Sequence, residues 1–311
     1  MDRVYLNLYL EFLKRFLKLK KPIKAVFDCS NGTTGLILNR IMNNESGVKD
    51  KVKNSIIRNS KFIILNKRPD GRFPAHGPNP LIKGATRQLE REVKKQKADL
   101  GVIFDADGDR VFFTDNRGKF IDSNETGYML MQMHKPPYVT GIVSSWRLKK
   151  CQVSGVRCQM YISRVGHYFF KKLMREKKAS LGLEHSGHYY FKDFFYCDSG
   201  IFAAIKVINF VSGLKTDLAS WLDKLPGYYR SGEINFEVED KEEILKRIEK
   251  RYKKSAEKID KMDGLTAEFG NWWFNLRPSN TEPLLRLNIE VKSQEILKGK
   301  LKEIKNLIIT A

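Results

Sequence analysis

Three aspartates, Asp105, Asp107 and Asp109, lie close together in the segment 104–110, which reads F-D-A-D-G-D-R. Their negative charges repel one another unless a cation lies between them, and a compact set of carboxylate oxygens suits Mg²⁺. The segment directly follows an apolar run that predicts a strand, and α/β sheets bind their ligands at the carboxyl ends of strands. An acidic surface turn is the alternative, but the preceding strand favours a metal site.

Two other classes of acidic loop match this segment less well. An EF-hand loop carries its glycine at position six and a bidentate glutamate at position twelve. Here Gly108 is at position four, and Asn116 stands where the glutamate would be. The nucleophile motif D-x-D-G-T of haloacid dehalogenases is closer, but Asp109 replaces its threonine and no second acidic metal motif follows.

A second polar segment, 182–188, reads G-L-E-H-S-G-H and also follows an apolar run. Glu184 and Ser186 place a carboxylate and a hydroxyl two residues apart between glycines. Both groups can hydrogen-bond the hydroxyls of a sugar. Taken alone, the segment is explained equally well as a polar loop with a hydrogen-bonded histidine.

A third segment, 277–283, reads R-P-S-N-T-E-P and combines Arg277 with Ser279, Asn280 and Thr281. A guanidinium close to short hydroxyl and amide side chains, with free backbone N–H groups, suits phosphate oxygens. The prolines restrict the backbone before any ligand binds. A plain turn is the alternative, and it leaves this combination of side chains unexplained.

Strands and helices alternate around the first two segments. Apolar runs predict strands at 24–28, 62–65, 100–104, 139–144 and 180–183, and helices at 4–19, 36–41, 86–97, 126–133, 167–176 and 201–211. The pattern starts afresh near Gly118. This order predicts two consecutive α/β units, the first built on a parallel sheet.

The last part of the chain has a different order of elements. A strand, a long charged helix at 241–259, two or three further strands and a helix from Ser293 predict a small α+β domain. The segment 224–227, K-L-P-G, marks its beginning. The predicted organisation is a linker helix at 1–21, α/β domains at 22–121 and 122–226, and an α+β domain at 227–311.

Composition narrows the function classes. The formal net charge is +21, which attracts anions. The Lys and Arg residues are dispersed, however, and no basic motif with interleaved aromatic residues occurs. Solvent-exposed helix faces therefore explain the charge better than a nucleic-acid interface does. No apolar run approaches the roughly 20 residues that span a membrane. The four cysteines form no C-x-x-C pair, which indicates the reducing cytoplasm.

In their order along the chain, the three segments resemble the loops of the alpha-D-phosphohexomutases, and most of all those of the phosphomannomutase/phosphoglucomutase branch. F-D-A-D-G-D-R is similar to the metal loop of that family, G-L-E-H-S-G-H to its sugar-binding loop G-x-E-x-S-G-H, and R-P-S-N-T-E-P to its phosphate-binding loop. Asn280 favours the mannose/glucose branch, since the glucosamine-phosphate branch commonly has glycine there. The resemblance covers nearly the whole chain and implies the last three of the four mutase domains.

The resemblance implies a function for each segment. Members of the family move a phosphoryl group between C1 and C6 of a hexose phosphate through a phosphoserine, a hexose 1,6-bisphosphate and Mg²⁺. Carried over residue by residue, the metal ligands are Asp105, Asp107 and Asp109, the residue near the transferring phosphoryl group is Arg110, the substrate side chains are His167, Glu184 and Ser186, and the phosphate ligands are Arg277, Ser279, Asn280 and Thr281.

One part of the family pattern is missing from the sequence. The serine loop of the first domain, of the type T-A-S-H-N-P, occurs nowhere in the 311 residues. We therefore expect that a first domain outside these 311 residues supplies the nucleophile, either as a separate polypeptide or from coding sequence upstream of Met1. We also expect that the chain alone binds Mg²⁺ more weakly and turns over little substrate. A non-catalytic sugar-phosphate-binding module and a nucleic-acid-binding chain are the alternatives from other classes.

Overall fold

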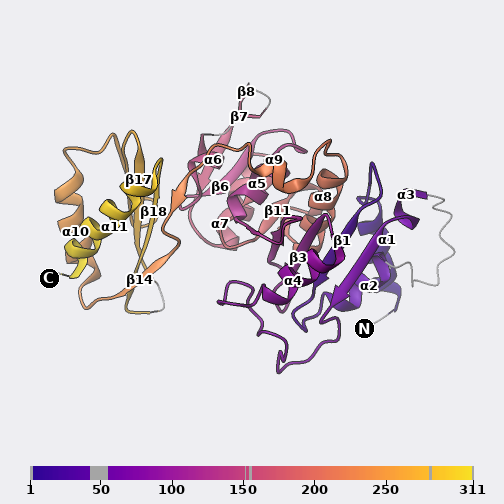
Figure 1. Cartoon of the computed structure of the whole chain (residues 1–311). Coiled ribbons are helices and arrows are strands. Elements are labelled where there is room, and N and C mark those ends of the chain that lie inside the picture. Colours follow the sequence, from indigo (N-terminus) through magenta and orange to yellow (C-terminus); the bar gives the residue numbers. More distant parts are fainter. Residues whose placement is uncertain (1–2, 43–54, 151, 154–155, 280–281, 310–311) are drawn as a thin grey trace.

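Three large sheets follow one another along the chain in the computed structural model, which describes residues 3–42, 55–150, 152–153, 156–279 and 282–309. Figure 1 shows them as three units coloured in succession from indigo to yellow. The first two are mixed α/β units and the third combines an antiparallel sheet with helices. The predicted fold class is confirmed.

The first unit places a buried strand in front of the three aspartates. Its sheet has the order β2-β1-β3-β4-β5. The strands are β1 (Lys24–Asp28), β2 (Lys61–Leu65), β3 (Leu100–Phe104), β4 (Val111–Thr114) and β5 (Phe120–Ile121), and the helices are α2 (Gly35–Met42), α3 (Ser55–Arg58) and α4 (Arg87–Gln96). Every residue of β3 is buried.

The three strands predicted for this unit form a parallel sheet, but two strands that the sequence did not predict extend it in the antiparallel direction. Strands β2, β1 and β3 are parallel, but β4 runs antiparallel to β3 and β5 antiparallel to β4. The physical reason is the acidic segment itself, because its tight turn sends the chain straight back beside β3. Hairpin connections of this kind produce antiparallel pairs.

The second unit repeats the arrangement with the sheet order β12-β11-β10-β6-β9. Strands β6 (Tyr138–Gly141), β9 (Met160–Ser163) and β10 (Leu181–Leu183) are parallel, and β11 (Tyr189–Phe191) and β12 (Cys197–Asp198) are antiparallel. The helices are α5 (Ser123–Met131), α6 (Trp146–Lys149), α7 (His167–Glu176), α8 (Gly200–Ser212) and α9 (Leu218–Leu222), with the 3-10 turn η1 (Lys192–Phe194) and a small hairpin of β7 (Gln152–Val153) and β8 (Val156–Arg157). The predicted bounds of α7 are confirmed.

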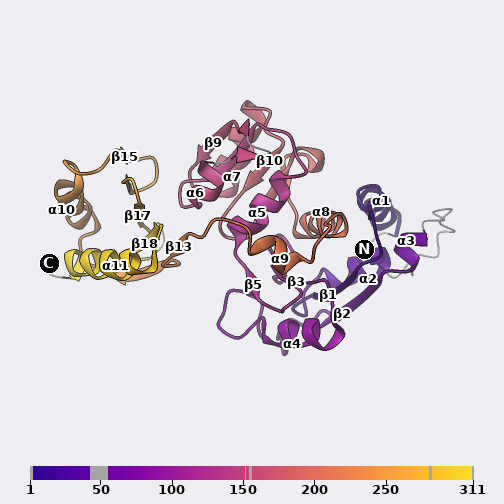
Figure 2. The same cartoon turned by 45° about the horizontal axis from the view of Figure 1, so that its top comes forward.

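The N-terminal helix α1 (Arg3–Lys14) packs on the second unit, beside α8 (Figure 2). The ring centroid of Phe16 lies 4.7 Å from that of Phe202. The sequence predicted this helix as far as residue 19, and it ends earlier. The backbone N–H of Lys18 donates to Asn209 Oδ1 at 2.8 Å, so a contact with α8 replaces the next helical turn.

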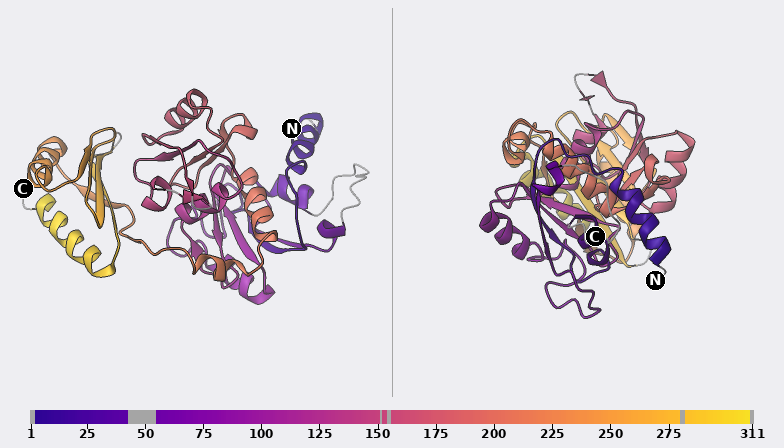
Figure 3. Two further views of the ribbon diagram at one scale, coloured as in Figure 1. Left: turned by 90° about the horizontal axis from the view of Figure 1, so that it is seen from above. Right: turned by 90° about the vertical axis from the view of Figure 1, so that its right-hand side faces the viewer.

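The C-terminal unit is a six-stranded antiparallel sheet. Its strands are β13 (Tyr229–Arg230), β14 (Ile234–Glu237), β15 (Lys258–Asp260), β16 (Leu265–Glu268), β17 (Trp272–Pro278) and β18 (Leu284–Val291), and its helices are α10 (Lys241–Tyr252) and α11 (Gln294–Ile309). Both helices cover the face turned away from the other units (Figures 1 and 3). The helix predicted at 241–259 ends at Tyr252, since residues 258–260 pair with β16 as an edge strand.

A buried carboxylate joins the C-terminal unit to the second unit. Glu290 on β18 is fully buried, and its Oε1 accepts hydrogen bonds from the Trp146 backbone N–H at 2.7 Å and from Trp273 Nε1 at 3.1 Å. Nε of Arg230, at the start of the unit, lies 3.5 Å from Glu290 Oε2. Nζ of Lys149 lies 3.9 Å from the centroid of the Trp273 ring. Burial lowers the pKa of Lys149 to about 8.

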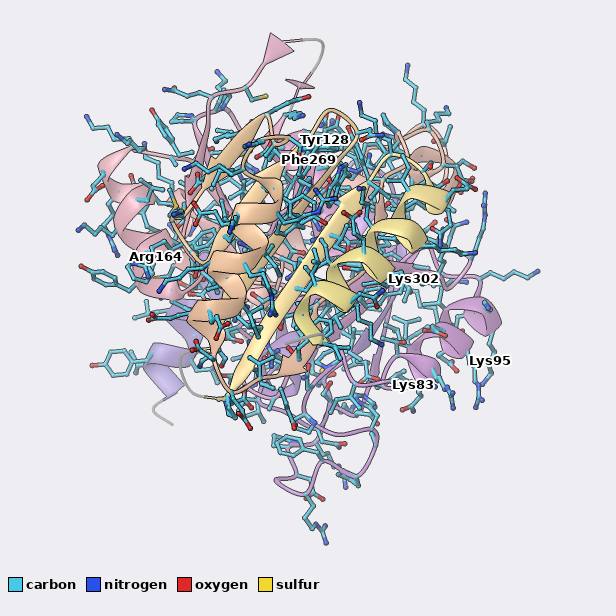
Figure 4. The ribbon with its side chains drawn as sticks, turned by 90° about the vertical axis from the view of Figure 1, so that its left-hand side faces the viewer. Lys83, Lys95, Tyr128, Arg164, Phe269 and Lys302 are labelled. Carbon is cyan, nitrogen blue, oxygen red and sulfur yellow. The ribbon has the colours of Figure 1, made fainter. Side chains whose placement is uncertain are left out.

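The positive charge is spread over the surface of all three units. Figure 4 labels the exposed side chains Lys83 and Lys95 on the first unit, Arg164 on the second and Lys302 on the third. Within the parts of the chain that the structure describes, no helix has the length and apolar character needed to cross a bilayer.

Candidate functional site

The loop that carries the three aspartates is fixed by its backbone carbonyls. The backbone N–H of Thr33 donates to Ala106 O at 3.0 Å, and the Thr33 hydroxyl donates to Asp107 O at 3.3 Å. The backbone N–H of Gly200, the first residue of α8, donates to Gly108 O at 3.0 Å. The loop is thus held from both sides, by its own unit and by the next one.

Glycine is required at both of these contacts. A Cβ on Gly32 would lie 2.2 Å from Ala106 O, and a Cβ on Gly200 would lie 2.6 Å from Gly108 O. Real Cβ atoms do not approach backbone atoms so closely. The backbone of the loop therefore packs directly on the backbone of its two neighbours.

The three aspartates each offer an oxygen within 4.8 Å of the others. Asp107 is exposed, whereas Asp105 is buried and accepts hydrogen bonds from Gly108 N, Arg110 N and Arg110 Nε at 3.0, 3.2 and 2.7 Å. Asp109 Oδ1 is buried, and no donor among the described residues reaches it. An all-oxygen set with an unpartnered buried carboxylate oxygen fits Mg²⁺.

The two less exposed aspartates, Asp105 and Asp109, have pKa values shifted in opposite directions. Burial raises the pKa of Asp105 to about 6, although the Arg110 guanidinium opposes the rise. A hydrogen bond with His188 lowers the pKa of Asp109 despite its burial. Asp109 is therefore ionised at neutral pH.

The sugar-type loop, 182–188, meets the acidic loop across the boundary between the first two units. Arg110 and His188 form an antiparallel bridge, and the backbone N–H of Val111 donates to Gly187 O at 3.2 Å. His188 Nε2 lies 3.3 Å from Asp109 Oδ2. These contacts make the two loops parts of one site.

His188 is held between carboxylates. Its Nδ1 lies 3.4 Å from Glu184 Oε2 and 2.8 Å from Ser186 Oγ, and Glu184 Oε2 also accepts from the Tyr190 hydroxyl at 2.9 Å. Burial opposes a charge on the ring, but Asp109 and Glu184 outweigh it and raise the pKa of His188 to about 9. Burial also opposes the charge of Glu184, yet the hydrogen bond with His188 gives this carboxyl a lowered pKa.

His167 opens helix α7 beside this group. Its Nδ1 lies 3.0 Å from Asp198 Oδ2, and its ring centroid lies 4.4 Å from that of His188. The preceding loop is tied to the C-terminal unit, because the backbone N–H of Val165 donates to Asp263 Oδ2 at 3.1 Å. The histidine is half-exposed and thus accessible to a ligand.

Two arginines face each other in the C-terminal sheet. Arg277 on β17 is in register with Arg286 on β18, and Glu233 lies between their guanidinium groups. Arg277 Nη2 donates to Glu233 Oε2 at 2.9 Å, and Arg286 Nη1 lies 3.6 Å from Glu233 Oε1. The Nε atoms of both arginines are buried and find no acceptor among the described residues. Two like charges with unused donors suit an oxyanion.

Ser279 lies at the end of β17, next to this pair. Its hydroxyl is 3.4 Å from Arg286 Nη2, and its carbonyl accepts from Lys241 Nζ at 3.0 Å. Asn280 and Thr281, the other two predicted phosphate ligands, lie outside the described residues. The contacts described for Arg277 and Ser279 stay within the C-terminal unit, whereas the other predicted site residues gather around Asp109 and His188.

Sequence reasoning did not select four residues that the geometry adds. They are His188, Asp198, Arg286 and Glu233. His188 closes the G-x-E-x-S-G-H pattern, so it had a signal in the sequence, and Asp198 begins the short polar segment D-S-G at 198–200. In the sequence, Arg286 is indistinguishable from a solvent-facing residue of a strand, and no motif around Glu233 indicates a functional role.

Comparison with known proteins identifies the family. Three models of the phosphoglucomutase/phosphomannomutase family match consecutive parts of the chain: alpha/beta/alpha domain II at residues 5–118, alpha/beta/alpha domain III at 122–229 and the C-terminal domain at 233–307. A phosphomannomutase of Methanocaldococcus jannaschii is 36% identical over 99% of this chain and 67% of its own length. The chain belongs to the phosphoglucomutase/phosphomannomutase family.

Solved structures share the fold of this phosphoglucomutase/phosphomannomutase chain. A family protein from Burkholderia thailandensis aligns with a TM-score of 0.83 at 23% identity, over 97% of this chain and 63% of its own. An N-acetylphosphoglucosamine mutase from Aspergillus fumigatus, in complex with GlcNAc-6P and magnesium, aligns with a TM-score of 0.65 at 14% identity, over 98% and 65%. The chain thus spans about two thirds of the length of these relatives.

Proposed function

We propose that this chain supplies the metal, sugar and phosphate sites of a phosphohexomutase that interconverts hexose 1-phosphate and hexose 6-phosphate. The observation that carries the proposal is the contact between His188 Nε2 and Asp109 Oδ2. This contact joins the acidic loop of the first unit, 104–110, which is called the magnesium-type loop from here on, to the sugar-type loop of the second unit. A phosphoryl group bound at the metal would thereby lie beside the hydroxyls of a hexose.

Each group has a role in this proposal. Mg²⁺ would be bound by Asp105, Asp107 and Asp109. The ion would neutralise negative charge on the phosphoryl group that is transferred. Arg110 lies next to these aspartates, and its Nε forms an ion pair with Asp105 Oδ2 at 2.7 Å. This ion pair keeps its remaining guanidinium donors close to the metal loop.

The sugar side would be bound by Glu184, Ser186 and His167. A buried carboxylate and a hydroxyl bind sugar hydroxyls in a defined direction. His188, which carries a positive charge at neutral pH, holds a proton between Asp109 and Glu184.

The phosphate that does not react would bind to Arg277 and Ser279, together with Asn280 and Thr281. We add Arg286 to this set, because its guanidinium faces Arg277 and reaches Ser279. A phosphate dianion would take the place of Glu233 between the two arginines. Two guanidinium groups on one phosphate give a clamp that is stronger than a single ion pair.

The nucleophilic serine would come from a first mutase domain, because the matched family models are those of domains II, III and the C-terminal domain. That domain would also contribute a fourth metal ligand, and hexose 1,6-bisphosphate would act as intermediate and activator. The compartment would be the cytoplasm, in keeping with the free thiols of Cys29 and Cys197.

The test is a complementation assay. Residues 1–311 are incubated with mannose 1-phosphate or glucose 1-phosphate, Mg²⁺ and a hexose 1,6-bisphosphate, with and without the first domain of the Methanocaldococcus jannaschii relative. We expect formation of the 6-phosphates only with the added domain, and Asp107→Ala should abolish it. Absence of turnover with a correctly folded added domain contradicts the proposal.

A second candidate is a sugar-phosphate-binding remnant without catalysis. The buried Nε donors of Arg277 and Arg286, which find no acceptor among the described residues, favour it, because a phosphate could occupy them without any phosphoryl transfer. Calorimetric titration with mannose 6-phosphate and glucose 6-phosphate separates the two candidates. Binding that needs Arg277, combined with no turnover under complementation, supports the remnant, and absence of binding contradicts both.

A further inference from the structure

Four side chains next to the magnesium-type loop form a second group of metal-ligand type. Asp109, His167, His188 and Asp198 each offer one ligand atom, and these atoms all lie within 4.8 Å of one another. The residues come from four places: the acidic loop, the start of α7, the sugar-type loop and the end of β12. The fold therefore brings them together from distant parts of the sequence.

The spacing of these atoms is close to that of a tetrahedral zinc site. Bonds of about 2.0–2.1 Å to nitrogen and oxygen place neighbouring ligand atoms about 3.3 Å apart. His188 Nε2 lies 3.3 Å from Asp109 Oδ2, and His167 Nδ1 lies 3.0 Å from Asp198 Oδ2. The widest separation that the group allows, 4.8 Å, would close by about 1.5 Å. The half-exposed His167 side chain has room for such a movement.

The donor set differs from that of the magnesium-type loop. Two imidazole nitrogens and two carboxylate oxygens suit zinc and its neighbours in the first transition series, whereas Mg²⁺ prefers oxygen ligands alone. The set Asp105, Asp107 and Asp109 has oxygen ligands only. The two groups thus differ in the metal that they prefer, although they share Asp109.

Neighbouring residues orient the ligands as they do in known zinc sites. Histidine ligands of zinc usually direct their second ring nitrogen at a carboxylate or another acceptor, which fixes the ring. Here His188 presents Nε2 to the group, and its Nδ1 lies 3.4 Å from the buried Glu184 carboxylate. Asp198 is held in a similar way, since Lys171 Nζ lies 3.1 Å from its other oxygen, Oδ1.

We propose that Asp109, His167, His188 and Asp198 form a binding site for a divalent transition metal of the zinc type, separate from the magnesium site and joined to it through Asp109. In this arrangement Asp109 Oδ2 faces His188. The buried Oδ1, which has no donor among the described residues, is left to bind the ion of the magnesium-type loop. Metal binding at His188 Nε2 releases the proton that this nitrogen otherwise shares with Asp109. The inference goes beyond the mutase proposal and does not depend on turnover.

The test measures Co²⁺ binding to the full chain by visible spectroscopy, because Co²⁺ replaces Zn²⁺ and its absorption bands report tetrahedral coordination. Untagged protein carrying Asp107→Asn is used, which weakens the magnesium-type loop and leaves the four ligands intact. We expect one equivalent of tetrahedral Co²⁺ that excess Mg²⁺ does not displace. His167→Gln and Asp198→Asn, each added to this background, should weaken binding at least about tenfold.

Asp193→Asn is the matched control, since it removes a nearby exposed carboxylate outside the group, and its Co²⁺ affinity should equal that of the background protein. Circular dichroism of each variant confirms that it is folded. The proposal is overturned if Co²⁺ does not bind, if Mg²⁺ displaces it, if the His167 and Asp198 variants bind it as tightly as the background protein, or if sulfur-to-cobalt charge-transfer bands show cysteine ligation.

Discussion

The backbone N–H of Trp146 donates a 2.7 Å hydrogen bond to Oε1 of Glu290, so a fully buried carboxylate of the C-terminal sheet caps the first turn of a helix in the neighbouring unit. The same oxygen accepts from Trp273 Nε1. Arg230, which lies beside Glu290, also reaches the sugar-type loop, where its Nη1 is 3.3 Å from His185 Nδ1. The junction of these units is therefore coupled to the sugar-type loop.

Glu290→Ala should destabilise this junction by about 2–4 kcal/mol, because it leaves two buried donors without an acceptor. Unfolding in urea, followed by tryptophan fluorescence, measures the loss of stability. Glu237→Ala, at an exposed position of β14, is the control and should change stability by less than about 0.5 kcal/mol. Equal midpoints for the two variants would contradict the role given to Glu290.

Gly200→Ala should weaken Mg²⁺ binding although Gly200 is no metal ligand. The added methyl group would lie 2.6 Å from Gly108 O, and relief of such a clash costs about 1–3 kcal/mol, so the loop that carries the aspartates must shift. Isothermal titration with Mg²⁺ measures the effect. Gly299→Ala on α11, where the methyl group meets nothing within 4 Å, should leave Mg²⁺ affinity unchanged and raise stability by about 0.5–1 kcal/mol.

Arg286→Ala should weaken the binding of hexose 6-phosphate about 10- to 100-fold. This is the loss of affinity expected when one charge-assisted hydrogen bond or ion pair is removed. Glu233→Gln should strengthen binding, because the carboxylate now between Arg277 and Arg286 competes with a phosphate. Calorimetric titration of the chain measures both changes. Arg251→Ala on α10, more than half exposed, is the control, and an Arg286→Ala affinity equal to that of the control would rule out the clamp.

Lys149 should make stability rise with pH above about 8. Its pKa is lowered to about 8 in the folded chain by burial and is about 10.4 when unfolded. Between these values the unfolded chain binds more protons than the folded chain, so the free energy of unfolding increases with pH. Below about pH 8 both states carry the proton, and the slope from this residue vanishes.

Lys149→Met is the variant that isolates this effect. The difference in unfolding free energy between parent and Lys149→Met should grow in favour of the parent from pH 8 to pH 9.5, as measured by urea unfolding at several pH values. The exposed Lys150→Met substitution should leave the pH dependence of the parent intact. A Lys149→Met profile parallel to that of the parent would show that the buried ammonium does not titrate in this range.

Much of the fold could be predicted because apolar runs mark buried strands. The predicted bounds of β1 and β3 are those observed, and the end of β3 located the three aspartates. Where elements end was harder to predict, because tertiary contacts decide it. Helix α1 ends at Lys14, and after one further turn the backbone N–H of Lys18 donates to Asn209 of α8 instead of to the helix.

The candidate site could be predicted as three separate loops but not as an assembly. Nothing in the local sequence indicates that His188 meets Asp109, since the contact depends on how two domains pack. Arg286 and Glu233 remained hidden for a related reason. A charged residue on a strand normally faces solvent, and only the register of β17 and β18 shows that two arginines face each other.

The hydrogen bond between Gly200 and Gly108 has a thermodynamic consequence for the molecule as a whole. It joins the second unit to the loop that carries the aspartates of the first, so a rotation between the units moves the proposed metal ligands. Metal affinity and inter-unit orientation are therefore linked, and linkage is reciprocal. A sugar phosphate that changes the orientation must change magnesium affinity by the same factor by which magnesium changes the affinity for the sugar phosphate.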